Sequence, residues 1–105
     1  MPDYLIINLV RFQRENDTTK KIMTPVNCKS VVNLNEVIYA CSSIIVHQGT
    51  QVNSGHYFAY VKTHRSEPDL AWACLNDQVT SYIAFGDIAF QSDQTPYILI
   101  FQKTN

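Results

Sequence analysis

A histidine at the start of a short apolar segment is the residue of this chain best suited to acid–base chemistry. His56 follows Gly55 and leads into residues 57–61, whose aromatic and β-branched side chains favour a β-strand. Alternation along that strand places His56 on one face and Tyr57 on the other. The glycine indicates a position where another backbone segment passes close. His56 is therefore a candidate general base at the mouth of a strand.

Asn76 and Asp77 end the next predicted strand, residues 71–75. If the two strands are antiparallel neighbours, the start of one lies near the end of the other, and the imidazole of His56 can meet an amide or carboxylate oxygen. Such an acceptor fixes the tautomer of the ring and leaves the other nitrogen as a base, as in a Cys/Ser–His–Asx triad. From spacing alone, a half-buried histidine bonded to a turn residue is the stronger interpretation.

The nucleophile of such a triad is not evident. The chain has three cysteines, Cys28, Cys41 and Cys74. Cys41 and Cys74 fall inside predicted strands, where a cysteine usually serves as a small buried hydrophobic residue. Cys28 follows an asparagine but lies in a predicted strand or loop. Because a thiol becomes a nucleophile only with a nearby base and a lowered pKa, we expect this chain to lack one.

Two long runs are predicted to form the centre of the fold. Residues 4–12 and 37–47 carry apolar side chains on both faces, which is typical of strands buried on two sides. Residues 48–54 form a loop that joins the second run to the strand of His56 as an antiparallel hairpin. Residues 13–21 are polar and charged, and we interpret them as a solvated turn or hairpin tip.

The remaining elements are shorter. Residues 78–81 favour a short returning strand, and residues 97–101 a last buried strand. In residues 82–91 apolar side chains recur at roughly helical spacing, which predicts a short helix that Gly86 weakens. Consecutive strands with one short helix indicate an α+β fold built mainly on an antiparallel β-sheet.

Composition argues against several classes of function. With 8 lysines and arginines against 9 aspartates and glutamates, the net charge is -1, so nucleic-acid binding has little electrostatic support. No run approaches the ~18 apolar residues that span a bilayer, and no secretion signal is evident, so we expect no membrane partner. The odd number of cysteines without a CxxC pair favours reduced thiols in the cytoplasm or nucleus. The scattered histidines predict no metal, and nothing predicts another cofactor.

Five segments, in order, resemble signature segments of the ubiquitin-specific protease family, the papain-like deubiquitinases. The clearest is GHYFAYV at residues 55–61, which resembles the family's histidine box. The others are PDYLIINLVRF at 2–12, resembling P-x-x-L-x-(I/V)-x-L-K-R-F; residues 39–49, resembling Y-x-L-x-A-V-x-x-H-x-G; WACLNDQV at 72–79, resembling W-x-x-(F/x)-(D/N)-D-x-x-V; and PYILIF at 96–101, resembling P-Y-x-L-x-Y. The chain departs from these patterns at Val10, Cys41 and Ser43, where lysine, leucine and a small apolar residue are usual.

The resemblance assigns roles to individual residues. It implies that His56 is the catalytic base, that Asn76 occupies the third triad position, and that Asp77 occupies the neighbouring acidic position. Gly55 and Tyr57 fall where the family grips the narrow Gly-Gly tail of ubiquitin. The expected substrate is therefore ubiquitin or a ubiquitinated protein.

The resemblance covers only the later part of the family's catalytic domain. The family's nucleophile lies upstream in a G-x-x-C-Y-x-N box, and its zinc-binding finger cysteines also lie upstream; no segment here matches either. Residues 1–105 are therefore expected to be a single partial domain, the C-terminal part of a ubiquitin-specific protease catalytic domain. Its partners would be ubiquitin and an upstream segment that carries the catalytic cysteine.

Two other interpretations remain open. The chain could be a non-catalytic module, truncated or pseudoenzyme-like, that binds ubiquitin or another protein without cleaving it. It could also be a small strand-rich domain with a satisfied core histidine, which the five ordered segments argue against.

Overall fold

A twelve-residue strand, β5, is the centre of the structure. The computed structural model describes residues 2–51 and 54–104. Within these residues the strands are β1 (Tyr4–Asn8), β2 (Phe12–Glu15), β3 (Thr18–Lys21), β4 (Val31–Leu34), β5 (Val37–Gln48), β6 (His56–Lys62), β7 (Trp72–Asn76), β8 (Val79–Ile83) and β9 (Gln94–Lys103). Two short 3₁₀ turns, η1 (Pro68–Leu70) and η2 (Phe85–Asp87), flank the β7–β8 hairpin.

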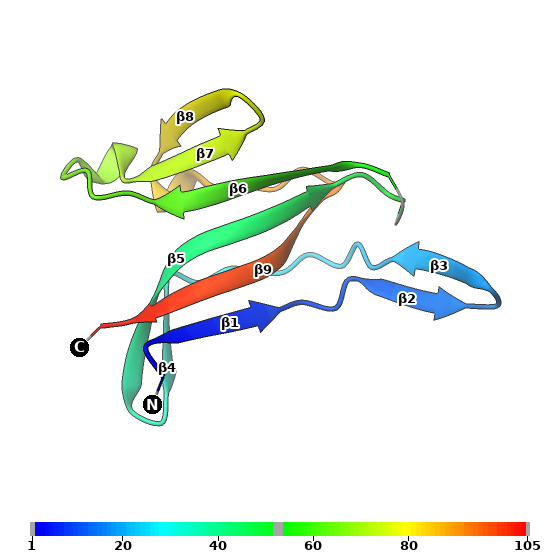
Figure 1. Ribbon diagram of the computed structural model, residues 1–105, viewed down its shortest axis with the longest axis horizontal. Helices are drawn as coiled ribbons and strands as arrows, with labels where there is room; N and C mark the ends of the chain where they lie inside the picture. Colours follow the sequence, from blue (N-terminus) through cyan, green and yellow to red (C-terminus); the bar gives the residue numbers. More distant parts are fainter. Residues whose placement is uncertain (1, 52–53, 105) are drawn as a thin grey trace.

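The strands form one large antiparallel sheet and a separate hairpin. Neighbours in the large sheet follow the order β1-β9-β5-β6-β7-β8, and β4 also pairs with β5. Strands β2 and β3 pair with each other and extend beyond the large sheet (Figure 1). The prediction of a mainly antiparallel sheet is confirmed, and so is the central place of residues 37–47, because β5 lies between β9 and β6.

The core lies on one face of the large sheet. Its buried side chains come mainly from β5, β6 and β9, and they include Tyr39, Ile44, Val46, Phe58, Leu99 and Phe101. Two segments outside the sheet lie over this face: residues 26–28 and residues 85–90, which include η2, line a small cavity together with Ile44. Because the covering segments have little regular structure, the core is held by apolar burial rather than by helix packing.

The first strand differs from its prediction. Residues 4–12 do not form a buried central strand: β1 ends at Asn8, and β9 separates it from β5, so β1 has a paired neighbour on one side only. Tyr4 is 56% exposed and Ile6 is 70% exposed, because they lie on the opposite face of β1 from Leu5, which packs against the core. An apolar run indicates that a segment favours burial, but it does not fix the position of the strand in the sheet. Here β9, the last strand of the chain, takes the place beside β5 and leaves β1 at the edge.

The prediction of a short helix over residues 82–91 is wrong, because this segment contains the end of β8 and the turn η2 instead. Tyr82 and Ile83 belong to β8, in register with Ala73 and Trp72 of β7, and the only helical turn in the described part of this segment is η2. The apolar side chains that suggested a helical period pack separately onto the core. Strand pairing with β7 therefore outweighed a weak helical pattern.

The β5–β6 hairpin forms as predicted, with Gln48 opposite His56 in the ladder. Residues 52 and 53 of its predicted loop lie outside the described residues. Over the described ranges, no helix has the length and apolar character needed to cross a membrane.

Candidate functional site

The large sheet brings His56 and Asn76 into contact. His56 is the first residue of β6 and Asn76 is the last residue of β7, and these strands are antiparallel neighbours. A hydrogen bond joins His56 Nε2 to Asn76 Oδ1. Because an amide oxygen only accepts, Nε2 carries the hydrogen and Nδ1 keeps its lone pair. This arrangement orients the ring and leaves one nitrogen able to take up a proton.

Asp77 lies close to the same ring but interacts with it less directly. Its Oδ2 atom is 3.7 Å from His56 Nε2, and its side chain is 78% exposed against 35% for His56. Asp77 has a φ of 54°, in the left-handed region that aspartate tolerates in tight turns. A solvent-exposed carboxylate at this distance attracts a protonated imidazole only weakly.

Gly55 is packed between the end of β5 and His56. Its φ of 122° is unfavourable for any residue with a side chain. A Cβ atom at this position would collide with the carbonyl oxygen of Gln48 and lie 2.7 Å from Nε2 of His47. The prediction that another backbone segment passes close to Gly55 is confirmed, and this contact determines where the chain enters β6.

Tyr57 lies on the opposite face of β6 from His56. Its ring centroid is 4.7 Å from that of His47 and 5.9 Å from that of Tyr97. The ring is still 53% exposed. Phe58 lies on the face of His56, and its ring is nearly parallel to the imidazole at a centroid distance of 6.3 Å. Aromatic rings thus flank the entry to β6 on both faces of the sheet.

His47 and Lys21 adjoin the site, although the sequence did not single them out as functional. His47 is 1% exposed, and its Nε2 donates to Ser54 O at 3.3 Å. Burial and the neighbouring Lys21 ammonium lower the pKa of His47 and favour the neutral ring. Gly49, two residues after His47, was a sequence signal that the backbone is closely packed here. A Cβ atom on Gly49 would lie 3.2 Å from the Cα atom of Gly55.

Lys21 is the clearest error in the sequence interpretation. Residues 13–21 were interpreted as solvated, and most of them are exposed, but Lys21 is only 9% exposed. Its Nζ atom donates to three backbone carbonyls, those of His47, Gly49 and Asp93. The charge pattern carried no signal for this contact because the three acceptors are backbone atoms remote in sequence.

None of the cysteines is joined to His56 by a hydrogen bond or ion pair in the described part of the chain. All three are free thiols, and the partners of the imidazole are Asn76 and Asp77. Burial raises the pKa of Cys28, and burial together with Cys28 raises the pKa of Cys41 to about 11. A raised pKa is the opposite of what a nucleophilic thiol requires.

The burial and the raised pKa of Cys41 predict that its thiol is alkylated slowly in the folded chain. At pH 8 a thiol with a pKa of about 11 is ionised in only about one molecule in a thousand, and Cys41 is 2% exposed. We expect iodoacetamide to leave Cys41 unmodified until urea unfolds the chain, as followed by mass spectrometry of its peptides. Modification of Cys41 at the same rate in folded and unfolded protein would contradict this assignment.

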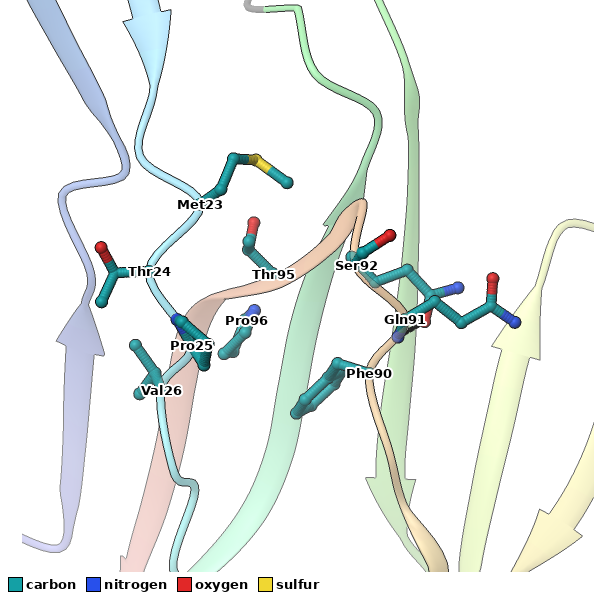
Figure 2. A pocket seen from close by; sticks show the side chains of 10 residues that line it. Met23, Thr24, Pro25, Val26, Phe90, Gln91, Ser92, Thr95 and Pro96 are labelled. Atoms are coloured by element: carbon teal, nitrogen blue, oxygen red, sulfur yellow. Dashed lines mark hydrogen bonds between the residues drawn. The ribbon is translucent and has the colours of Figure 1, made fainter.

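A separate cavity of about 300 Å³ lies between residues 23–26 and residues 90–96. Figure 2 shows Met23, Pro25, Phe90 and Pro96 around it, with Thr95 between them. His56 and Asn76 do not line this cavity, so it is distinct from the histidine site. In the described part of the chain, no group of three histidine, cysteine, aspartate or glutamate side chains could hold a metal ion.

Comparison with known proteins identifies the family. Residues 1–101 match the family described as "Ubiquitin carboxyl-terminal hydrolase". The chain is 27% identical to mouse "Ubl carboxyl-terminal hydrolase 18" over 127 residues, which covers 99% of this chain and 33% of that protein. It is 26% identical to "Ubiquitin carboxyl-terminal hydrolase 10" of Saccharomyces cerevisiae over 110 residues, which covers 97% of this chain and 13% of that protein.

A solved structure has the same fold. The "Ubp8-Sgf11-Sgf73-Sus1 SAGA DUB module" contains a chain that superposes with a TM-score of 0.83 and 25% identity, over 100% of this chain and 25% of that chain. The chain therefore spans a third or less of the length of these relatives. By its sequence and its fold, the chain belongs to the ubiquitin carboxyl-terminal hydrolases, the family of the ubiquitin-specific proteases, and corresponds to part of their catalytic domain.

Proposed function

We propose that this chain supplies the general base and its orienting partner to a cysteine-type deubiquitinase. The reaction is hydrolysis of the isopeptide bond after the C-terminal glycine of ubiquitin. The observation that carries the proposal is the hydrogen bond from His56 Nε2 to Asn76 Oδ1, which leaves Nδ1 as the basic nitrogen. The cysteine itself would come from a segment outside this chain, since Cys28 and Cys41 have raised pKa values and the partners of the ring in the described residues are Asn76 and Asp77.

The proton transfers follow from this geometry. Nδ1 of His56 takes the proton of the cysteine thiol, and the thiolate adds to the isopeptide carbonyl carbon. The imidazolium then donates that proton to the departing lysine amine, and a thioester to ubiquitin remains. Water attacks the thioester while Nδ1 accepts a proton, which returns to the thiolate as the ubiquitin carboxylate leaves. Asn76 holds the ring in one orientation through both half-reactions.

The proposed substrate channel involves the residues on either side of His56. Gly55 packs so tightly against Gln48 and His47 that it has no room for a side chain, and the ring of Tyr57, on the opposite face of β6 from His56, is 53% exposed. We propose that these two residues form one wall of a channel for the glycine tail of ubiquitin. Asp77 is proposed to help polarise the protonated ring, at a distance of 3.7 Å.

A second candidate function is supported by the state of the cysteines. If no segment provides a nucleophile, the same wall would bind ubiquitin or another protein without cleaving it. The raised pKa of the buried Cys41 and of Cys28 favours this alternative for the chain acting alone.

A ubiquitin probe with a C-terminal electrophile separates the two candidates. We expect no labelling of the 105-residue chain alone. We expect labelling of a longer protein in which the chain is joined to an upstream segment that carries the catalytic cysteine; this is the longer protein of the experiments below. Labelling of the isolated chain at Cys28 would overturn the view that it holds no nucleophile. Binding of unmodified ubiquitin, with no labelling of either protein, would support the non-catalytic function.

A further inference from the structure

We propose that Lys21 is a positioning residue for the His56 site, because its ammonium group holds the end of β5 where Gly55 and His56 need it. The inference rests on the proposed role of His56 as the base. Lys21 is argued to act through His47 and Gly49 and not on any reacting atom. Its role is therefore to place the base and not to take part in the chemistry.

The ammonium of Lys21 is buried and fully satisfied. Its Nζ atom lies 3.2 Å from His47 O, 2.5 Å from Gly49 O and 3.2 Å from Asp93 O. An ammonium has three N–H donors, so each donor has a carbonyl acceptor. Burial lowers the pKa of Lys21, the Asp93 carboxylate opposes this effect, and Arg11 adds to it. A buried cation persists only where such acceptors compensate its lost hydration.

The three acceptors belong to two segments that Lys21 joins. His47 and Gly49 lie at the end of β5, whereas Asp93 immediately precedes β9. The backbone N–H of Gly49 also donates to Asp93 O at 2.9 Å. Lys21 is the last residue of β3, and Figure 1 shows β3 in the hairpin that is separate from the large sheet. Its side chain thus anchors that hairpin to the ends of β5 and β9 near which β6 begins with His56.

Contacts continue from these segments to His56. His47 Nε2 donates to Ser54 O at 3.3 Å, and the His47 ring lies against Gly55. Gly49, with a φ of 127°, is so close to Gly55 that a Cβ atom on it would lie 3.2 Å from the Gly55 Cα. Gly55 directly precedes His56. A shift of His47 or Gly49 therefore moves the backbone that sets the ring opposite Asn76.

The test is the tautomer of His56 in the 105-residue chain, read from a long-range proton–nitrogen NMR spectrum. The wild-type ring should carry its hydrogen on Nε2, bonded to Asn76. Lys21→Met keeps an unbranched apolar stem and removes the ammonium. We expect it to lower the ratio of the Nε2–H to the Nδ1–H tautomer by about tenfold, the effect of losing one hydrogen bond of ordinary net strength. Lys29→Met, at an exposed position, is the matched control and should leave the ratio unchanged.

The outcomes are distinct. A folded Lys21→Met chain with the wild-type tautomer ratio and only a lower melting temperature would overturn the proposal, because Lys21 would then be merely structural. If Lys21→Met does not fold, Gly49→Ala perturbs the same contacts while the ammonium remains. An unchanged tautomer ratio in folded Gly49→Ala would also overturn the proposal. A wild-type ring with no preferred tautomer would instead refute the Asn76 contact, and with it the proposed function.

Discussion

Replacing His56 with alanine is expected to lower the rate of isopeptide cleavage by the longer protein by about 10²–10⁴-fold, the usual contribution of a general acid–base. Without the imidazole, no group at this position can take the thiol proton or return it to the leaving amine. The measurement is kcat/KM on a ubiquitin–lysine isopeptide substrate, together with labelling by the electrophilic ubiquitin probe. Ubiquitin affinity should change little, because the imidazole acts on the proton rather than on the folded part of ubiquitin.

His64→Ala is the matched control for this prediction. His64 is exposed and lies in the polar segment after β6, so its removal should leave the rate unchanged. If His56→Ala and His64→Ala retain the same activity, His56 is not the base.

The same assay distinguishes the two residues beside the ring. Asn76→Ala should lower kcat by roughly 10–150-fold, because the lost hydrogen bond stabilises an imidazole that becomes charged in the reaction. Asp77→Ala should lower kcat by no more than about fivefold, since Asp77 is an exposed partner 3.7 Å away. A larger loss for Asp77→Ala than for Asn76→Ala would assign the orienting role to Asp77 instead.

Replacing Gly55 with alanine is expected to reduce the free energy of unfolding by about 2–6 kcal/mol. Part of the loss comes from the positive φ of 122°, which costs roughly 1–3 kcal/mol for a residue with a side chain. The rest comes from the collision of the new Cβ with Gln48 O and His47 Nε2, since overpacking typically costs about 1–3 kcal/mol. Urea unfolding followed by the fluorescence of Trp72, the single tryptophan, measures the difference.

Gly86→Ala provides the control for this substitution. A Cβ atom on Gly86 would meet nothing within 4 Å, and no positive φ applies there, so stability should change by no more than about 0.5 kcal/mol. Equal stability of the two variants would show that the backbone at Gly55 relaxes without cost. In the longer protein, Gly55→Ala should also weaken probe labelling, because it displaces the adjacent His56.

The elements that were predicted correctly have signals local to the chain. The strand of His56, the hairpin before it and the Asn76–Asp77 turn are each encoded within a few residues by β-branched, glycine or turn-forming positions. The order of these segments along the chain also made the family recognisable, and the match over residues 1–101 confirms that recognition.

The errors have a common cause. The apolar run of residues 4–8 is as hydrophobic as a central strand, yet β9 lies between β1 and β5, so β1 is an edge strand, and Ile6 lies on its exposed face. The period of residues 82–91 suggested a helix, but pairing of Ile83 with Trp72 required a strand. In both places a partner remote in sequence decided the outcome.

In the functional site, too, some features follow from local sequence and others from contacts between segments remote in sequence. The sequence by itself determined which side chains can perform acid–base chemistry. It gives the residue types of His56, Asn76 and Asp77, and its local strand and turn pattern places them at strand ends. Only the tertiary structure decided that Nε2 of His56 bonds to Asn76, that Asp77 stays in solvent, and that Lys21 is buried against His47 and Gly49. Every residue has a backbone carbonyl, so residue types do not show which carbonyl will accept a hydrogen bond. The acceptor depends on which segments lie together in the folded chain.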